Sequence, residues 1–517
     1  MSLGVPGWCC RFVIMFYRNK KNKSGVISVQ VIDKSSGSYK VVKTMGSSAD
    51  ANEIQKLQDQ AQQWIKDRTG KLELDFSGEV ETAIQLLEGI EQLSVQGTEL
   101  LLGKLFKEIG FDQIKDELFR KLVIARLCHP TSKLGTTDYL HKYHYLNVDV
   151  QAVYRYLDKL YLKQKDLIQN ISYEHTRKIL DNKISILFYD VTTLYFEIDN
   201  EDELRKTGFS KDGKHQHPQI VLGLLVSVDG YPLAYEIFEG NKFEGHTMLP
   251  VIEAFKKKYQ LDNLVIIADS GLLSNDNVSE LQEKGYSFIL GARIKSEKKD
   301  IQARILQLKL DNGESQLIQK DEHTKLLINY SLSRAKKDHS NREKGLKKLE
   351  KQIKTGKLTK ANINNRGYNK YLKLEGSMEV SIDKIKFESD SKWDGLKGYL
   401  TNTSLSKNEI IENYGHLWKI EKAFKVSKTD LKIRPIYHYK STRIAAHICI
   451  AFVAYKIYKE LERQLKAKHA ELSPEKAINI AKTIYNITLV TPTTKDKISK
   501  TLILTEEQKK LMALFEL

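Results

Sequence analysis

Three acidic residues, far apart in the chain, have the types and settings expected of metal ligands. Asp190 follows the apolar run Ile-Leu-Phe-Tyr, Asp269 follows Val-Ile-Ile-Ala, and Glu421 lies in a segment of helical periodicity. Carboxylate oxygens are the ligands that Mg²⁺ and Mn²⁺ prefer. Two such ions about 4 Å apart can activate an attacking oxygen and stabilise the leaving oxygen of a phosphodiester. The three residues therefore suit metal-dependent phosphoryl transfer.

The two apolar runs predict strands that end at a ligand-binding edge. We expect Asp190 and Asp269 at strand ends, because α/β sheets bind ligands there. An aspartate after a strand is also ordinary turn chemistry, so each one alone is more often structural. The occurrence of two such aspartates favours a shared site.

Glu421 is expected on the apolar face of one continuous helix that packs on this sheet. Residues 406–409 resemble a capping box. Positions then recur at spacings of three and four: Ile410, Tyr414, Leu417, Glu421, Phe424 and Lys428. A carboxylate buried on such a face is costly unless a cation or hydrogen bonds satisfy it. Lys425, one turn on, is the alternative partner in a simple ion pair.

The elements around the aspartates predict a mixed sheet flanked by helices. Strands are expected at 184–189, 220–228, 233–238, 264–268 and 287–292, with helices at 246–258 and 275–284. Strands in hairpin order that later alternate with helices are typical of an α/β fold with a mixed sheet.

A chain of 517 residues is too long for one ordinary core. We expect an N-terminal extension and β hairpin at 1–48, a helical DNA-binding region at 49–178, and the first part of the catalytic core at 179–295. An insertion domain at 296–405 and the second part of the core, with C-terminal helices, at 406–517 follow. Residues 1–14 lack periodicity, which leaves Met1 and Met15 as alternative starts.

The charge balance favours a polyanionic partner. Lys and Arg number 83 against 66 Asp and Glu, for a net charge of +17, and nucleic acid is the first such partner to consider. Arg155 would lie on the second helix of a helix-turn-helix in 131–160, although a helical bundle with a basic face reads the same. Four cysteines without paired spacing and the lack of a membrane-length apolar stretch predict a cytoplasmic protein with no membrane partner.

The most specific motif lies at residues 414–428. It resembles the Tyr-x2-Arg-x3-Glu-x6-Lys signature of IS4-type insertion-sequence transposases, and more closely their IS1634-like branch, over about residues 15–461. Tyr414, Glu421 and Lys428 have the expected spacing, whereas Leu417 replaces the Arg, so that Lys419 or His416 would have to make its DNA contact. The surroundings of Asp190 and Asp269, and residues 240–247 between them, also resemble this family.

This resemblance implies a DDE transposase that cleaves insertion-sequence ends and joins the 3′-OH to target DNA, using two Mg²⁺ or Mn²⁺ ions. Its fold would be an RNase H-like core, interrupted before the last helix by a mainly β insertion domain. The partners would be double-stranded DNA, as terminal inverted repeats and target, and a second copy in a dimer on DNA, near the bacterial nucleoid.

The resemblance also implies DNA contacts from Tyr414 and Lys428. Trp393 of the insertion would stack on a flipped base, with a tryptophan that anchors a turn as the alternative. An RNase H-like nuclease without strand transfer and a catalytically silent DNA-binding descendant remain alternative functions.

Overall fold

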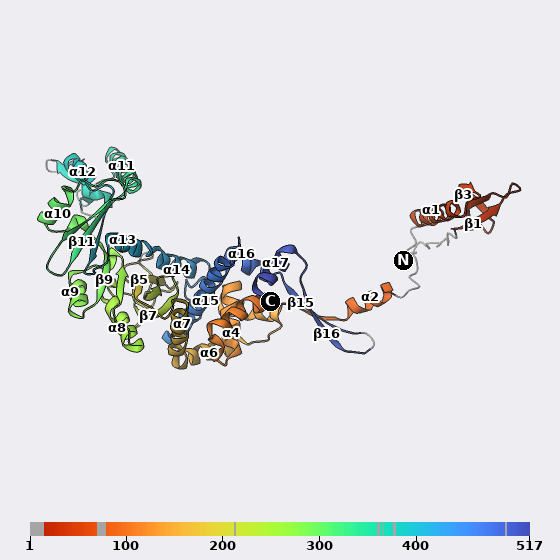
Figure 1. Cartoon of the computed structure of the whole chain (residues 1–517), viewed down its shortest axis with the longest axis horizontal. Helices are drawn as coiled ribbons and strands as arrows, with labels where there is room; N and C mark the ends of the chain where they lie inside the picture. Colours follow the sequence, from red (N-terminus) through yellow and green to blue (C-terminus); the bar gives the residue numbers. More distant parts are fainter. Residues whose placement is uncertain are drawn as a thin grey trace, which may run out of the picture. The chain divides into compact units, whose positions relative to one another are not determined.

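The computed structural model describes residues 15–69, 79–210, 213–358, 362–364, 367–375, 379–491 and 494–517 (Figure 1). The extension expected at residues 1–14 lies outside the described residues. The chain divides into two units, one formed by Met1–Ile90 with Leu489–Lys497 and the other by Glu91–Thr488 with Ile498–Leu517.

The first unit contains a three-stranded antiparallel sheet. Strands β1 (Met15–Lys21), β2 (Ile27–Asp33) and β3 (Lys40–Ser48) lie in the order β1-β2-β3. Val29 and Val31 of β2 and Ala61 of helix α1 (Ala51–Thr69) form its small buried core. The predicted hairpin is therefore part of a larger sheet, because β1 pairs with β2 along its whole length. Helix α2 (Glu79–Glu88) follows.

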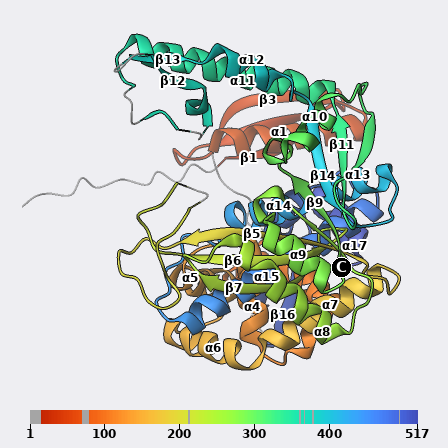
Figure 2. The same ribbon diagram turned by 90° about the vertical axis from the view of Figure 1, so that its left-hand side faces the viewer.

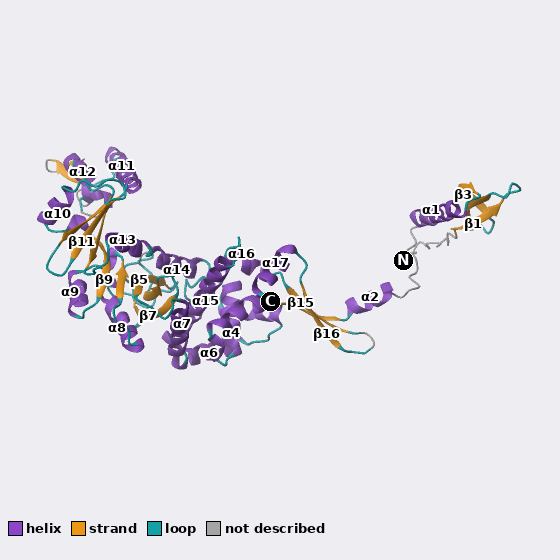
Figure 3. Ribbon diagram, in the orientation of Figure 1, coloured by secondary structure: helices purple, strands orange, loops and turns teal. Residues whose placement is uncertain are grey.

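The second unit is built around an eight-stranded mixed sheet of order β10-β11-β14-β9-β8-β5-β6-β7. Strands β5 (Ile186–Tyr195), β6 (Gln219–Ser227) and β7 (Pro232–Glu239) form an antiparallel meander. Strand β8 (Val265–Ala268) is parallel to β5, and β9 (Ser287–Ala292) is parallel to β8. Figure 3 shows these strands between helices. The predicted mixed sheet is thus confirmed.

Three strands of the insertion extend the same sheet. β14 (Leu396–Thr401) pairs antiparallel with β9, β11 (Lys325–Tyr330) with β14, and β10 (Ser315–Gln319) with β11. Through these pairings the insertion adds its own strands next to β9, in the same sheet that contains the aspartates.

The rest of the insertion is largely helical. It comprises α10 (Lys299–Leu306), α11 (Leu332–Lys354), the hairpin of β12 (Leu372–Glu375) and β13 (Glu379–Ile382), and α12 (Lys384–Ser391) (Figure 2). The expectation of a mainly β insertion domain is wrong. The side chain of Ser331 accepts a hydrogen bond from the backbone N–H of Arg334 and so caps α11, whose many Lys, Glu, Arg and Gln residues are good helix formers.

Helices cover both faces of the sheet. Helices α8 (Met248–Tyr259) and α9 (Asn275–Glu283) contribute to one apolar cluster, with alternate residues of β5 and β8. The other face packs against α13 (Lys407–Gly415), α14 (Trp418–Thr429) and α15 (Ser441–Ala467). Within the described ranges, no helix combines the length and the apolar composition that crossing a bilayer requires.

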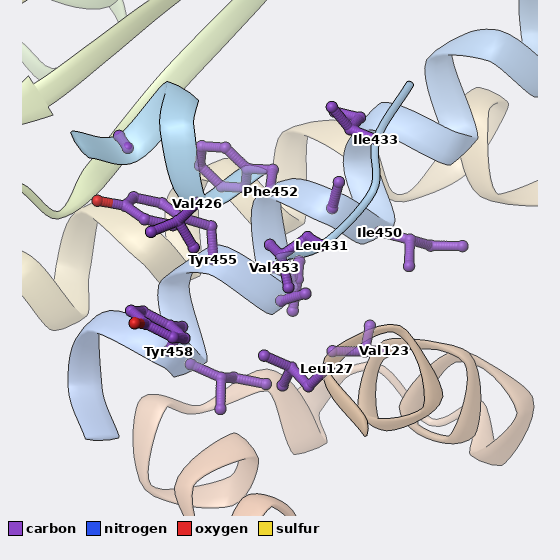
Figure 4. Packing of buried hydrophobic residues seen from close by; sticks show 14 of the residues in the cluster. Val123, Leu127, Val426, Leu431, Ile433, Ile450, Phe452, Val453, Tyr455 and Tyr458 are labelled. Atoms are coloured by element: carbon purple, nitrogen blue, oxygen red, sulfur yellow. The ribbon is translucent and has the colours of Figure 1, made fainter. Parts of the chain in front are cut away.

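Helix α15 packs against helices that precede the sheet in the chain: α3 (Lys104–Ile109), α4 (Glu117–Cys128), α6 (Val150–Lys163) and α7 (Lys165–Ile179). Helix α5 (Lys133–His144) packs against α4 and α6. Figure 4 shows Val123 and Leu127 of α4 packed near Ile450 and Val453 of α15. The C-terminal part comprises α16 (Pro474–Ala481), β15 (Tyr485–Val490), β16 (Lys497–Leu502) and α17 (Glu506–Phe515). Strands β15 and β16 form a sheet with β4 (Ile90–Val95).

Candidate active site

Asp190 and Asp269 are brought side by side by the pairing of two parallel strands. Tyr189 of β5 is in register with Ala268 of β8, and each aspartate is the next residue in its chain. Neighbouring strands are about 4.8 Å apart. The two carboxylates, 79 positions apart in the numbering (269 minus 190), therefore lie at one place on the sheet.

The structure corrects the expectation that β5 ends at Asp190. The strand continues to Tyr195, and residues from Asp190 onward pair with β6. The β-branched residues Val191, Thr192 and Thr193 favour this continuation. In contrast, β8 does end at Ala268, and Asp269 begins a turn by accepting the Ser270 backbone N–H at 2.7 Å. The acidic site therefore lies where β8 stops while β5 runs on.

Both aspartates belong to the face of the sheet that α14 covers. Side chains two residues apart along a strand share a face. Phe188 and Ile267, two residues before the aspartates, lie in the same buried cluster as Ile420 of α14. Helix α14 and strand β5 are in direct contact. The helix that carries Glu421 is therefore placed on the aspartate side of the sheet.

The expected continuous helix is broken before Glu421. Helix α13 ends at Gly415, and α14 starts at Trp418 after a tight turn in which the N–H of Leu417 donates to the Tyr414 carbonyl at 3.0 Å. Gly415 lacks a side chain and has low helix propensity, which favours the break. Glu421 consequently lies in the first turn of α14, where the helix dipole stabilises a negative charge.

Glu421 is exposed rather than buried, contrary to the expectation from periodicity. Within the described part of the chain, no ion pair joins its carboxylate to Lys425, although Lys425 is one turn away. In the described ranges, the simple ion pair that the sequence left open is therefore not formed. The carboxylate faces solvent at the edge of the apolar contact made by Ile420 and Phe424.

Tyr414 connects α13 to the second aspartate. Its hydroxyl donates to Oδ1 of Asp269 at 3.1 Å, and its ring is buried. Gly291 of β9 makes room for this hydroxyl, because a Cβ atom there would lie 2.4 Å from the Tyr414 oxygen and 2.9 Å from the Ser270 nitrogen. Burial and the neighbouring Asp269 raise the pKa of Tyr414, so that the hydroxyl keeps its proton and remains a donor.

Lys397 of β14 lies beside Tyr414, on the side of the site that the insertion forms. Its ammonium lies 4.4 Å from the centre of the Tyr414 ring and 5.3 Å from that of Tyr399. Burial lowers the pKa of Lys397, while the charges of Asp269 and Glu421 act in the opposite direction. The same two carboxylates also contribute to the raised pKa of Tyr414. Asp269 and Glu421 are therefore both within electrostatic range of these two side chains.

A fourth carboxylate lies near the two aspartates. Glu244 begins the short turn Glu244–His246, and a Cβ atom at Gly271 would lie 4.0 Å from its Oε2. Buried Asn277 of α9 holds this region by donating to the carbonyls of Gly245 and Leu272, both at 2.8 Å. The loop between the aspartates is thereby tied to the turn after Asp269.

The donor set fits a hard divalent cation in chemistry, since it consists of carboxylate oxygens on one solvent-facing part of the sheet. Asp190 and Asp269 each use Oδ1 for the next backbone N–H, at 2.8 and 2.7 Å. Among the residues that the structure describes, however, no three Asp, Glu, His or Cys side chains are close enough together to hold a metal ion. Glu421 is thus near the aspartates without closing a three-ligand site.

The other residues predicted to contact DNA differ in their exposure and in their partners. Arg155 is exposed on α6, and Lys428 is half-buried in the last turn of α14. Lys419 donates to the Val228 carbonyl at 2.6 Å. Trp393 is buried among the apolar residues of the insertion, and its backbone takes part in the turn before β14. Leu417, at the position of the family's Arg, is also buried, so that no side chain from there reaches solvent.

Sequence reasoning missed Lys397, Gly291 and Glu244. Glu244 lies in a segment that was recognised as similar to the family, but its carboxylate was not identified as a neighbour of the aspartates. Lys397 and Gly291 are unremarkable in sequence, since no motif or spacing connects a single lysine or a single glycine to Asp269. Only the pairing of β9 with β14, in which Ala292 is opposite Gly398, brings them to the site.

The fold and these carboxylates define an α/β protein with an acidic site at the boundary between its sheet and the insertion. The family model described as the transposase DDE domain matches residues 181–457, more than half of the chain. The chain therefore belongs to the DDE transposase family. No curated protein matches it.

Two solved structures are similar to the chain at low sequence identity. One is a piggyBac transposase synaptic complex with hairpin DNA, at 10% identity and a TM-score of 0.39, covering 78% of this chain and 79% of that one. The other is a Mos1 transposase paired-end complex with the left transposon end, at 11% identity and a TM-score of 0.16, covering 44% of this chain and 66% of that one.

Proposed function

We propose that this protein is a transposase of the IS4 type, in its IS1634-like branch, that cleaves the ends of an insertion sequence and joins the freed 3′-OH to target DNA. The observation that carries the proposal is the position of Asp190 and Asp269 directly after Tyr189 and Ala268, which are paired between β5 and β8, within the segment matched by the transposase family model. The strand order β7-β6-β5-β8-β9 supports an RNase H-like core.

Asp190, Asp269 and Glu421 are proposed as the ligands of two Mg²⁺ or Mn²⁺ ions. Bound there, the ions would activate the attacking oxygen and stabilise the leaving oxygen of a phosphodiester. Tyr414 holds Asp269 in one orientation through its hydroxyl. Since Glu421 is exposed in the first turn of α14, its carboxylate would move toward the aspartates when metal and DNA bind.

The cleft next to Asp269 is proposed to receive the DNA end. It has a volume of about 570 Å³, and Ser270 and Lys397 line it on the side of the site. Arg293, Arg334 and Arg342 are among the basic residues that line the cleft, which suits a phosphate backbone. Trp393 forms part of its wall and is proposed to stack there on a base that leaves the helix.

DNA and a second copy of the chain are the proposed partners. Arg155 on the helical region, Lys419 and Lys428 on α14, and Tyr414 are the proposed DNA contacts, of which Arg155 is the most exposed. Cutting two ends in concert requires two active sites, so we propose a dimer on DNA. The site of action would be the nucleoid of a bacterial cell.

The test is a joining reaction with candidate terminal inverted repeats, Mg²⁺ and a supercoiled target plasmid. The wild-type chain is expected to give joined products, and Asp190→Asn or Asp269→Asn to give none while still binding DNA. Asp262→Asn, at an exposed position before β8, is the matched control and should retain activity. Nicked DNA without joining would instead identify a nuclease, and bound but uncut DNA a silent binder.

A further inference from the structure

A second pocket lies away from the acidic site, where α4 and α5 meet the segment that follows α14. Its volume is about 450 Å³. Four basic side chains in its lining are each more than nine-tenths buried, with exposed fractions of 5% for Arg126, 6% for Lys133, 8% for His438 and 6% for His447. They come from α4, α5, the segment after α14, and α15. Four elements thus direct basic groups into one small space.

Among the described residues, these basic side chains make few hydrogen bonds, and the acceptors of those bonds are neutral. Arg126 Nη1 donates to the Leu431 carbonyl at 3.5 Å. His447 Nε2 is 3.0 Å from the Ile433 carbonyl, which can only accept, so Nε2 carries a proton. His447 Nδ1 then accepts from Lys133 Nζ at 3.5 Å. For Arg126 and Lys133, which have five and three N–H donors, the described residues leave most of the donor capacity unused.

No carboxylate neutralises this cluster among the described residues. Asp158 of α6 is near enough to act on His438, but Arg443 of α15 already engages both of its oxygens, at 2.9 Å each. A buried charge without an opposite charge is destabilising. Burial accordingly lowers the pKa of Arg126 to about 10, that of His438 to about 3, and that of Lys133 well below its usual range.

The backbone adds a further positive potential. Helix α5 has twelve residues and begins at this pocket, where Ser132 is its N-cap and the side chain of Ser132 accepts the Gly135 N–H. The N-terminus of a helix carries a partial positive charge and presents N–H groups that suit anions. The helix end and the buried side chains therefore favour the same kind of ligand.

We propose that this pocket binds a phosphate oxyanion, held by Arg126, Lys133 and the first turn of α5. The mouth of the pocket identifies the phosphate of a nucleic-acid strand as the source to test first. Lys432 and Arg434 also line it, and Tyr437 at its edge and Tyr439 nearby are 65% and 69% exposed. Exposed aromatic rings among basic residues provide stacking surfaces next to phosphate contacts.

The position of the pocket gives such binding a consequence for the active site. The segment that forms its wall begins directly after α14, the helix of Glu421. Leu431 and Ile433 fix this segment to α15 and α4 in the apolar cluster (Figure 4). A DNA phosphate bound here would therefore be held in a fixed position relative to the acidic site. The DNA source rests on the proposed function, whereas anion binding does not.

Calorimetric titration of the full chain with inorganic phosphate, at constant ionic strength set by chloride, tests the proposal. Lys133→Met and Arg126→Met should each weaken phosphate binding by at least about tenfold, the loss expected when one charged hydrogen bond is removed. Lys142→Met, at an exposed position of the same helix α5, is the matched control and should bind like the wild type. Unchanged binding in Lys133→Met, or no binding by the wild type, would overturn the proposal.

Thermal unfolding separates an anion site from a purely structural lysine. In phosphate-free buffer, Lys133→Met should unfold at the same temperature as the wild type or higher, because it removes an uncompensated buried charge. A lower unfolding temperature there would show a structural role and contradict the proposal. Competition by an oligonucleotide duplex identifies DNA as the source of the phosphate, and its absence identifies a free phosphate. Asp269→Asn should bind phosphate normally, so that a failed joining reaction does not affect this test.

Discussion

The hydroxyl of Tyr414 donates a hydrogen bond of 3.1 Å to Oδ1 of Asp269, although the two residues are 145 positions apart in the chain. This contact joins the helix before Glu421 to the end of β8, and so couples two parts of the proposed metal site. The space for it exists because Gly291, on the neighbouring strand, has no side chain.

Tyr414→Phe should slow DNA cleavage about 10-fold to 100-fold, because Asp269 loses the donor that orients it, while the buried ring is retained. Single-turnover cleavage at saturating DNA measures this effect, and the Mg²⁺ concentration for half-maximal rate should rise. Tyr399→Phe is the control, since the Tyr399 ring packs against Tyr414 at 4.8 Å without an Asp269 bond. Equal rates for wild type and Tyr414→Phe would mean that the bond has no catalytic importance.

Gly291→Ala should impair cleavage at least as much as Tyr414→Phe, because the new methyl group would lie 2.4 Å from the Tyr414 oxygen. Overpacking of this kind also costs about 1–3 kcal/mol of stability. The double variant Gly291→Ala with Tyr414→Phe removes the clashing oxygen and should be more stable than Gly291→Ala alone. Urea unfolding of the wild type, the two single variants and the double variant gives the interaction energy between positions 291 and 414. If the two substitutions changed the free energy of unfolding additively, the close approach of the two residues would be contradicted.

Glu421→Gln should abolish metal-dependent cleavage, by at least about 1000-fold, while DNA binding and folding persist. The carboxylate is exposed and makes no ion pair with Lys425 in the part of the chain that the structure describes. The free energy of unfolding should therefore change by only about 0.5 kcal/mol or less. Glu412→Gln, exposed on α13, serves as the control. A large loss of stability in Glu421→Gln would indicate a structural carboxylate instead.

Acidification should destabilise the protein through His438. Burial lowers its pKa to about 3 in the folded chain, against about 6.5 when unfolded. Below pH 6.5 the unfolded chain therefore binds a proton that the folded chain does not, and stability falls as the pH decreases toward 3. In phosphate-free buffer, the His438 contribution should reduce the free energy of unfolding by about 1–2 kcal/mol between pH 7 and pH 5.

Urea unfolding at several pH values measures this effect. His438→Gln should show a shallower decrease with falling pH than the wild type, because its side chain does not titrate. His469→Gln, at an exposed position, should follow the wild-type curve. Identical slopes for His438→Gln and the wild type would show that folding does not lower the pKa of His438.

The sequence by itself determined the mixed sheet and the positions of its strands around the two aspartates. Apolar runs of strand length before Asp190 and Asp269 are local signals, and β-branched residues favour strands wherever they pack. The capping box at Ser406 and Glu409 was also predicted and is present. The helix break near Gly415 and the continuation of β5 beyond Asp190 were not predicted. Glycine and β-branched residues favour them locally, but the packing of neighbouring elements decides whether such preferences are realised.

Only the tertiary structure decided which residues accompany the aspartates. The register of β5 with β8 places Asp190 beside Asp269, and the strands contributed by the insertion bring Gly291 and Lys397 to the same place. Pairing between distant strands is set by packing over the whole sheet, and a sequence pattern of period two carries no information about the partner strand. The chemistry of the site was therefore evident from residue types, whereas its geometry arose from contacts between segments far apart in the chain.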